Sequence, residues 1–202
     1  MLTKEELKAR IINACDEVIA AEAELTEIDS HFGDADHGVT MTKISNAIKE
    51  GVEEAEGGIQ AMLDEAACNV MMINGGSAVP LWNTWLDAMQ ENAAEGEEMD
   101  AEAVKEMFKA AYEELAALSK AKVGDKTMMD SLIPATEALV ACEGDIEAIF
   151  NAAAEAAIQG CEASKGFVSK FGRARSYGEQ TIGTPDAGAT SMKYFFVGLA
   201  KK

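Results

Sequence analysis

The spacing of apolar residues constrains the fold of this chain more than any other feature of its sequence. Apolar residues recur every three or four positions in eight segments, which is the period of an amphipathic α-helix. Alanine is abundant, and alternating runs of β-branched residues, which favour strands, are nearly absent. The sequence therefore predicts an all-α protein with helices over residues 3–23, 40–53, 59–73, 81–92, 101–118, 129–142, 145–170 and 189–199.

The breaks between these segments are short, and none has the length or low complexity of an interdomain linker. With 202 residues, 48% of them hydrophobic, the chain is long enough to bury one sizeable core. We therefore expect a single domain over residues 1–202, built as a bundle or barrel of about eight antiparallel helices. The polar breaks then gather at the ends of the bundle, where several of them together can form a site.

Charge limits the partners of this chain. There are 36 acidic against 17 basic residues, and the formal net charge is −19. A surface of this sign repels nucleic acid and anionic membranes, so neither is an expected partner. A phosphorylated ligand would need metal ions or a local cluster of hydrogen-bond donors to bind.

The N-terminus and the cysteines indicate where the chain works. Met1 is followed by Leu-Thr-Lys-Glu-Glu, which lacks the features of a signal peptide, and no apolar run approaches the roughly 18 residues that span a bilayer. We expect a soluble, cytoplasmic protein. No two cysteines have the spacing of a metal or redox pair, which predicts four reduced, buried side chains at Cys15, Cys68, Cys142 and Cys161.

The stretch DSHFGDADHGVTM, residues 29–41, places Asp29, Asp34 and Asp36 within eight positions. Carboxylates this close need raised pKa values or a cation, and their hard oxygen ligands suit Mg²⁺ or Ca²⁺. The spacing does not fit an EF-hand, because Ser45 stands where the bidentate glutamate belongs. The alternative is a solvated acidic loop in which Asp36 caps the next helix.

The stretch NGGSAVPLW, residues 74–82, combines glycines with a new helix start, where Ser77 can cap the helix and Pro80 fits its first turn. Such a start suits nucleotide or phosphate contact, although the sequence contains no Walker A motif. A plain corner between two helices is the simpler interpretation.

Two further stretches place basic residues beside acids and glycines. In GDKTMMD, residues 124–130, Lys126 can contact a phosphate or pair with Asp125 or Asp130; taken alone, the ion pair is favoured. In GRARSYGEQTIGTPDAGATSM, residues 172–192, Arg173 and Arg175 stand out in an acidic chain. Arginine clamps phosphate oxygens, whereas surface arginines that balance local acid are the alternative.

Histidines and methionines near these stretches have ordinary interpretations as well as functional ones. His31 and His37 flank the carboxylates and raise general acid–base chemistry, but a histidine at a helix start more often only donates a hydrogen bond. The methionine pairs at 71–72 and 128–129 are expected in the core, although one methionine could line an adenine slot.

In this order and at these separations, GDADHGVTM, GGSAVPL, GDKTMMD and GRARSYGEQTIGTPDAGATS resemble the nucleotide-binding L subunit of dihydroxyacetone kinase. The resemblance covers almost the whole chain. It implies a barrel of eight antiparallel helices that binds ADP or ATP at one end through magnesium ions, expected to be two, held by aspartates. The matching metal ligands are Asp29, Asp34 and Asp36.

The resemblance also implies which residues surround the nucleotide, with Arg173 in direct contact with phosphate. No residue of this chain is implied as a nucleophile or base. The nucleotide-binding set is His37, Gly38, Val39, Thr40, Ser77, Ala78, Met128, Arg173, Asp186, Ala187 and Gly188.

The partners implied by the resemblance are two further subunits. A phosphohistidine carrier phosphorylates the bound ADP, and the resulting ATP gives its phosphate to dihydroxyacetone held on a substrate-binding subunit. ATP-dependent members use free ATP with a fused substrate domain, for which this chain has no room. The sequence also allows a homodimer.

Some positions depart from the family pattern. The family usually has asparagine at the position of Thr40, and glycines at those of Val79 and Asn83. The carboxylate trio is intact. A divergent paralogue acting on another small hydroxyketone or sugar, or a regulatory adaptor that binds a partner without turnover, is therefore an alternative to dihydroxyacetone kinase.

Overall fold

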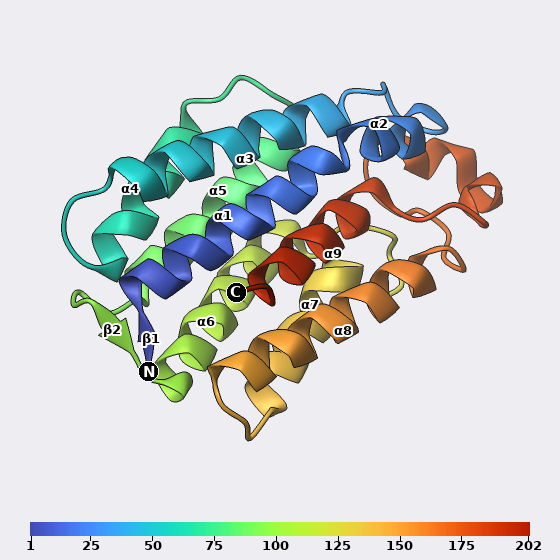
Figure 1. Cartoon of the computed structure of the whole chain (residues 1–202). Coiled ribbons are helices and arrows are strands. Elements are labelled where there is room, and N and C mark those ends of the chain that lie inside the picture. The colour runs from blue at the N-terminus through green and yellow to red at the C-terminus, as the bar shows by residue number, and fades with distance from the viewer.

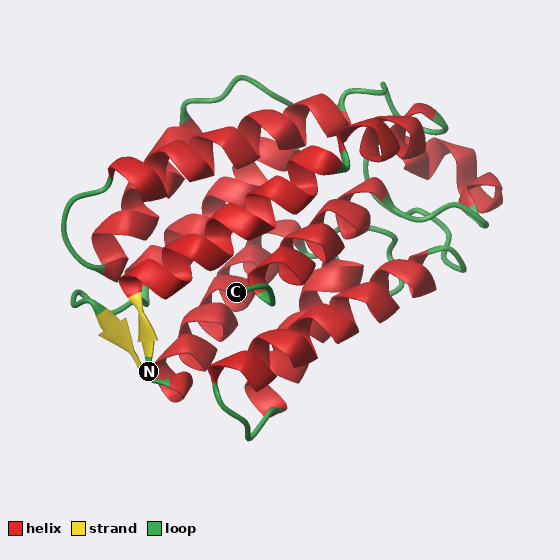
Figure 2. Cartoon of the chain, viewed as in Figure 1, coloured by secondary structure: helices red, strands yellow, loops and turns green.

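The computed structural model describes residues 1–202 and is almost entirely helical, as the sequence predicts (Figure 2). All eight predicted segments form helices, although their ends differ by a few residues. They are α1 (Lys4–Ala20), α3 (His37–Glu54), α4 (Ile59–Met71), α5 (Ala78–Glu91), α6 (Ala101–Ser119), α7 (Met129–Ala141), α8 (Ile146–Ser164) and α9 (Ala187–Leu199).

These eight helices form a closed ring (Figure 1). Helix α1 packs on α3, each later helix packs on the next, and α9 packs back on α1. Neighbours run antiparallel because short loops join them. At the closure, the Arg10 guanidinium near the start of α1 donates to the carbonyl of Leu199 at the end of α9 at 2.7 Å. The predicted antiparallel barrel is confirmed, and it encloses one apolar cluster of 45 buried residues.

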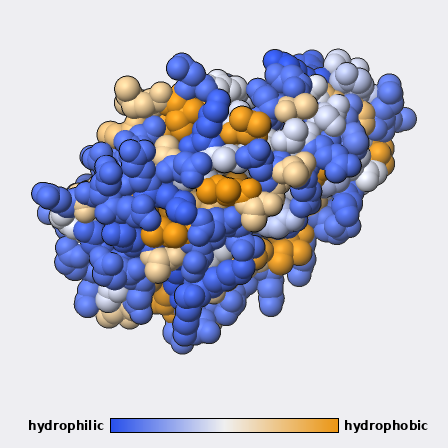
Figure 3. All heavy atoms as spheres, turned by 45° about the horizontal axis from the view of Figure 1, so that its top comes forward, coloured by the Kyte–Doolittle hydropathy of each residue, from blue (hydrophilic) through white to orange (hydrophobic).

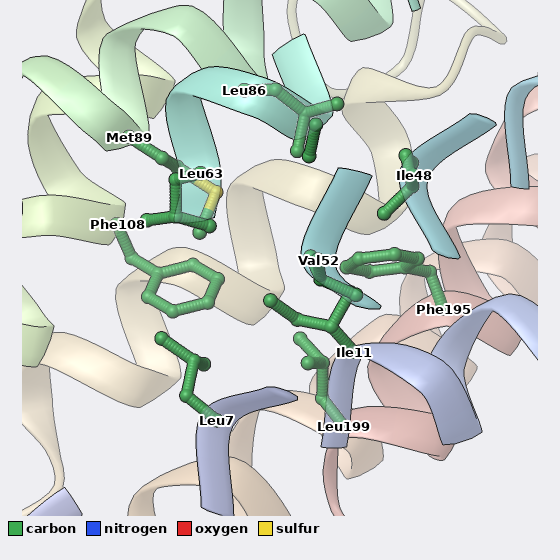
Figure 4. Close-up of a pocket in the computed structure, with 11 residues that line it drawn as sticks. Leu7, Ile11, Ile48, Val52, Leu63, Leu86, Met89, Phe108, Phe195 and Leu199 are labelled. Atoms are coloured by element: carbon green, nitrogen blue, oxygen red, sulfur yellow. The ribbon is translucent and has the colours of Figure 1, made fainter. Parts of the chain in front are cut away.

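Aromatic side chains fill the inside of the barrel. Trp82, Trp85, Phe108, Phe195 and Phe196 come from three helices and meet at ring separations of 5.1–6.2 Å, mostly edge to face. Such contacts add to the stabilisation from burial. The apolar cavity beside Phe108 and Phe195 measures only about 10 Å³ (Figure 4), so the barrel interior is packed and holds no ligand chamber.

Two helices differ from their predicted extent. The predicted helix 3–23 stops at Ala20, and after Ala21 a separate helix α2 (Glu22–Ser30) packs on α3 and α9. No glycine or proline marks this break, so only packing reveals it. The predicted helix 145–170 stops at Ser164. The carbonyls of Ser164 and Phe167 accept hydrogen bonds from the side chain of Lys126 and not from a further turn of helix.

Short elements complete the fold. The predicted loop after residue 172 contains a 3₁₀ helix, η1 (Arg173–Thr181), kinked at Gly178 where φ is +56°. The orange-red η1 (Figure 1) lies next to the loop that follows α2, where the rings of Tyr177 and Phe32 are tilted by 60° with centroids 5.1 Å apart. Strands β1 (Leu2–Thr3) and β2 (Glu98–Met99) pair antiparallel next to the start of α1. Thr3 and Glu6 form a capping box there, the pattern of a helix start.

The surface is mainly hydrophilic in the view of Figure 3. No helix is both long and apolar enough to cross a bilayer. Cys15 and Cys161 are buried as predicted, whereas Cys68 is exposed and Cys142 is half-buried. The expectation for Met71 and Met72 is wrong: their exposed fractions are 63% and 78%, because α4 ends at Met71 and its last turn emerges from the barrel.

Candidate nucleotide and metal site

A pocket of about 500 Å³ opens at the end of the barrel where α3, α5, α7 and α9 begin. The four residues that precede these helices, Asp36, Ser77, Met128 and Asp186, all line it. Each helix N-terminus presents backbone N–H groups and the positive end of a helix dipole. Four such ends around one pocket favour an anion, and phosphate is the anion that helix N-termini bind most readily.

Three of these four helices lack a side-chain cap. The side chains of Asp36, Ser77 and Met128 accept no hydrogen bond from the first turn of their own helix, so the predicted capping by Asp36 and Ser77 is wrong. Both residues have helical ψ values near −10° and −18°, which turn the side chain away from the cap position. Only Asp186 caps its helix, by accepting from the amide of Ala189 at 2.8 Å.

Asp29, Asp34 and Asp36 lie at one side of the pocket, and one carboxylate oxygen of each falls within 4.8 Å of the others. Asp29 Oδ2 accepts from the amides of Asp36 and His37, at 3.1 and 3.4 Å, which fixes the loop around the trio. Gly33 makes room for it, since a Cβ there would lie 2.0 Å from Asp29 Oδ1. Three hard oxygen ligands with this separation fit Mg²⁺.

Arg173 reaches the carboxylate trio from η1. Its guanidinium pairs with the Asp34 carboxylate across the pocket, and both side chains remain partly open to water. An exposed pair of this kind contributes little to stability. The arginine is therefore available to a ligand phosphate when a metal ion takes over the charge of Asp34. Arg175, two residues on, is exposed and does not line the pocket.

His37 is the histidine of the pocket. Burial lowers the pKa of His37 and so favours the neutral ring, although the charges of Asp29 and Asp36 act in the opposite direction. Its Nε2 lies 3.2 Å from the hydroxyl oxygen of Ser191. The ring thus ties the start of α3 to α9, which fits the hydrogen-bonding role that the sequence favours over acid–base chemistry.

The structure brings most of the predicted nucleotide residues into this pocket. The members that line it are His37, Thr40, Ser77, Ala78, Met128, Arg173, Asp186, Ala187 and Gly188. Two do not. Gly38 faces α2, where a Cβ would lie 2.2 Å from the Glu22 carbonyl oxygen, and Val39 points outward with 44% of its surface exposed.

Other lining residues escaped the sequence motifs. Phe32 and Phe171 add aromatic surface, and Ser119 and Ser169 add hydroxyls. Phe32 lies inside the carboxylate stretch but carries no metal-ligand signal. Ser169 sits in a segment predicted to be helical. Only the fold shows that these four residues share a pocket.

Lys126 also lines the pocket but pairs with neither Asp125 nor Asp130. Asp125 pairs with Lys170 at 2.7 Å, and the Asp130 carboxylate accepts from the amides of Gly124 and Thr127. The predicted ion pair is therefore wrong, because the lysine side chain enters the protein instead of lying on its surface. Nearby, burial raises the pKa of Asp186 to about 6.

Comparison with known proteins identifies the family of this chain. The sequence pattern of the DAK2 domain matches residues 31–201. The chain belongs to the DAK2 domain family. The pocket lies within this match except for the residues of α2 that reach it, Ile28 and Asp29.

Two kinds of relative resemble this DAK2 domain. It is 37% identical over 193 residues to a D-erythrulose kinase of Mycolicibacterium smegmatis and 32% identical to an L-erythrulose kinase of Pectobacterium atrosepticum, but it spans only about a third of either protein. It is 27% identical to the ADP-binding subunit of the PEP-dependent dihydroxyacetone kinase of Escherichia coli, with 96% of each chain covered. These relatives are named as phosphotransferases or their subunits.

A solved structure supports the fold. The dihydroxyacetone kinase of C. freundii superposes with a TM-score of 0.71 at 22% identity, covering 96% of this DAK2 domain and 34% of that chain. The predicted resemblance to the dihydroxyacetone kinase L subunit and the all-α barrel are thereby confirmed.

Proposed function

We propose that this chain is the nucleotide-binding subunit of a kinase complex that phosphorylates dihydroxyacetone or a close analogue. The observation that carries the proposal is the pocket itself, in which three carboxylates and Arg173 face four helix N-termini. In a chain of net charge −19, a phosphorylated ligand needs such a local concentration of positive potential. ADP or ATP with magnesium satisfies both the carboxylates and the helix ends.

In this proposal Asp29, Asp34 and Asp36 would hold magnesium, as two ions, beside the phosphates of the nucleotide. Magnesium supplies charge neutralisation there when bound. Arg173 contacts phosphate directly, and the amides at the starts of α3, α5 and α9 cradle the rest. Met128, which lines the pocket, is proposed to contact the adenine. The protein contributes orientation and electrostatics, and its pocket offers no nucleophile.

The donor and acceptor sit on partners in this proposal. A phosphohistidine carrier phosphorylates the bound ADP, and the ATP formed passes its phosphate to dihydroxyacetone on a substrate-binding subunit. The coverage of 96% of both chains in the match to the Escherichia coli ADP-binding subunit supports a separate subunit. Free ATP as the phosphate donor is the alternative. The erythrulose kinases support it, because their sequences extend well beyond this match.

A four-carbon ketose is the second candidate acceptor. The erythrulose kinases are 37% and 32% identical to this chain, against 27% for the Escherichia coli subunit. Transfer rates to dihydroxyacetone and to the two erythrulose enantiomers, measured with one partner subunit at a time, discriminate between these acceptors.

The surroundings of the pocket support a docked partner. Eight of the ten large hydrophobic side chains that the structure exposes belong to helix ends and loops at the pocket end of the barrel. They are Val39, Met71, Met72, Leu118, Val123, Phe171, Tyr177 and Ile182. Exposed apolar side chains gathered at one end are typical of an interaction surface. Replacing Met72 with aspartate should slow transfer to the acceptor while leaving ADP affinity unchanged.

Calorimetric titration with ADP, with and without Mg²⁺, tests the proposed function. The wild-type chain should bind ADP tightly only when Mg²⁺ is present. The Asp34→Asn variant should no longer gain ADP affinity from Mg²⁺, while its circular dichroism spectrum stays that of the wild-type chain. Failure of the wild-type chain to bind Mg²⁺ and ADP, alone or with a partner subunit, would refute the proposal. Native mass spectrometry of the purified protein reveals copurified ADP and distinguishes a monomer from the homodimer.

A chain that retains ADP but never passes phosphate in a reconstituted system would instead be the regulatory adaptor. Rapid transfer to a hydroxyketone excludes that alternative.

A further inference from the structure

The ammonium group of Lys126 lies inside the protein, surrounded by backbone carbonyls. Its Nζ donates to the carbonyl oxygens of Ser164 at 2.9 Å, Phe167 at 3.2 Å, Thr181 at 2.7 Å and Thr184 at 2.6 Å. The residue is only 4% exposed, and no carboxylate lies within ion-pair distance of it. Three N–H groups shared among four carbonyls leave none of this ammonium's donors unused.

These four carbonyls come from one continuous segment, residues 164–186, here called the wall because seven of its residues line the pocket: Ser169, Phe171, Gly172, Arg173, Ala174, Pro185 and Asp186. Ser164 ends α8, Thr181 ends η1, and the other two lie in the loops after them. Carbonyls at helix ends have no partner in their own helix and carry the negative end of its dipole, which a cation stabilises. The ammonium group of Lys126 therefore joins four otherwise separate carbonyls of this wall.

The other contacts of that wall each join two points. The Ser169 amide donates to the Thr181 hydroxyl at 3.0 Å, the Gly183 amide to the Lys165 carbonyl at 2.7 Å, and the Lys170 amide to the Asp125 carbonyl at 3.1 Å, beside the Lys170–Asp125 ion pair. Asp186 is tied to the Ser164 hydroxyl by its amide at 3.0 Å. None of them joins as many points of the segment as the four carbonyls that Lys126 brings together.

The backbone around Lys126 is held in a fixed conformation. Its backbone is left-handed, with φ at +60°, and Asp130 holds the loop on both sides by accepting from the amides of Gly124 and Thr127 at 2.6 and 2.7 Å. Burial lowers the pKa of Lys126, while Asp186 and Asp130 oppose this effect. A left-handed, non-glycine residue persists only where the surrounding structure determines it.

We propose that Lys126 is a positioning residue for the nucleotide: its ammonium group, held by four carbonyls, sets the shape of wall 164–186 and so brings Arg173 and Asp186 to the pocket. The lysine acts through this wall and makes no contact with phosphate. The inference rests on the proposed function only in that nucleotide affinity is one of its readouts.

The main test compares Lys126→Met with Lys165→Met. Both changes remove one positive charge from the same part of the molecule, but the Lys165 side chain is partly open to solvent and pairs only with Glu162. A binding group that moves away from its ligand contributes steeply less to affinity. Lys126→Met should therefore weaken Mg²⁺-dependent ADP binding roughly 10- to 100-fold, and Lys165→Met should weaken it less than about twofold. Equal ADP affinity in a folded Lys126→Met variant and in the wild-type chain would overturn the proposal.

Chemical rescue separates positioning from general stability. Lys126→Ala removes three methylenes and the ammonium, which are the atoms of propylammonium. Added propylammonium should restore ADP affinity to this variant, whereas propan-1-ol at the same concentration and ionic strength should not. Loss of affinity that propylammonium fails to restore contradicts the assigned role.

Hydrogen exchange of the wild-type chain needs no variant. If the lysine fixes the wall, the amides of Ser169, Lys170 and Gly183 exchange slowly and together, although they lie outside any α-helix. Exchange at open-loop rates would overturn the proposal even if neither variant folds. Failure of the wild-type chain to bind Mg²⁺ and ADP would refute the proposed function and leave this exchange result to decide on Lys126.

Discussion

The two ends of the barrel begin the same number of helices but treat their first turns differently. At the end away from the pocket, Thr3, Asp100 and Asp145 cap α1, α6 and α8, each with a side-chain oxygen on the third amide of its helix. The first amides of α4, at the same end, donate to the carbonyls of Gly96 and Ala94. Every helix start at this end has a partner within the chain.

At the pocket end only α9 has a side-chain cap. The residue directly before α3, α5 or α7 does not cap its helix with its side chain; the first amides of α3 and α7 donate instead to the Asp29 carboxylate and the Thr127 hydroxyl, and the start of α5 has no side-chain partner. A capped helix end is stable by itself, whereas an uncapped one gains stability from a bound anion. The difference supports the proposal that a ligand binds at the pocket end.

The largest change at the pocket end should come from Arg173→Gln. A lost charge-assisted hydrogen bond costs about 1.5–3 kcal/mol, so ADP affinity with Mg²⁺ should fall roughly 10- to 100-fold. Stability without ligand should change little, because the pair with Asp34 is exposed. Calorimetry measures the affinity, and Arg175→Gln is the matched control. Equal losses in both variants would show that only overall charge matters.

A pH-dependent effect should come from Asp186→Asn. Burial raises the folded pKa of Asp186 from 3.8 to about 6, so between these values the unfolded chain has released a proton that the folded chain keeps. The free energy of unfolding therefore loses a contribution as pH rises through this window. Asparagine keeps the cap and carries no charge, so the variant should gain about 1–2 kcal/mol at pH 7 and almost nothing at pH 4. This gain is smaller than the full pKa shift would give, because water in the open pocket screens the charge of Asp186.

Thermal unfolding of the ligand-free chain at both pH values measures this gain. A gain of the same size at pH 4 and pH 7 would contradict the electrostatic cause.

At the capped end, Asp145→Ala should lower the free energy of unfolding by about 1 kcal/mol, because it removes the cap on the amide of Ala148. ADP affinity should stay unchanged, since α8 begins at the opposite end from the pocket. Denaturant unfolding and calorimetry check the two halves of this prediction. Weaker ADP binding in this variant would mean that the two ends are energetically coupled.

The smallest expected effect is that of Ala35→Gly. Ala35 lies between two of the carboxylates with φ at +59°, a conformation that glycine adopts without strain. The variant should gain roughly 0.5–1 kcal/mol in the free energy of unfolding with Mg²⁺-dependent ADP binding preserved. Destabilisation would show that the flexibility of glycine in the unfolded chain outweighs the relief of strain.

Much of this molecule could be predicted from its sequence because the relevant signals are local. Apolar spacing depends on the helical period alone, so all eight barrel helices were predictable, and the capping box at Thr3 and Glu6 needs only residues three apart. The crowding of Asp29, Asp34 and Asp36 likewise follows from neighbours in the chain, and the structure places their oxygens within 4.8 Å.

Only the tertiary structure decided what depends on distant partners. Lys126 looked like half of a surface ion pair, yet carbonyls 38 to 58 positions away receive its ammonium. Helix α2 separates from α1 and packs on α3 and α9, with no breaker in its sequence. Met72 carries an apolar side chain that the barrel leaves exposed. Sequence periodicity thus determined the helices, and the spacing of the acids determined the carboxylate cluster. The closure of the ring determined which loops meet, because that depends on contacts between segments remote in the chain.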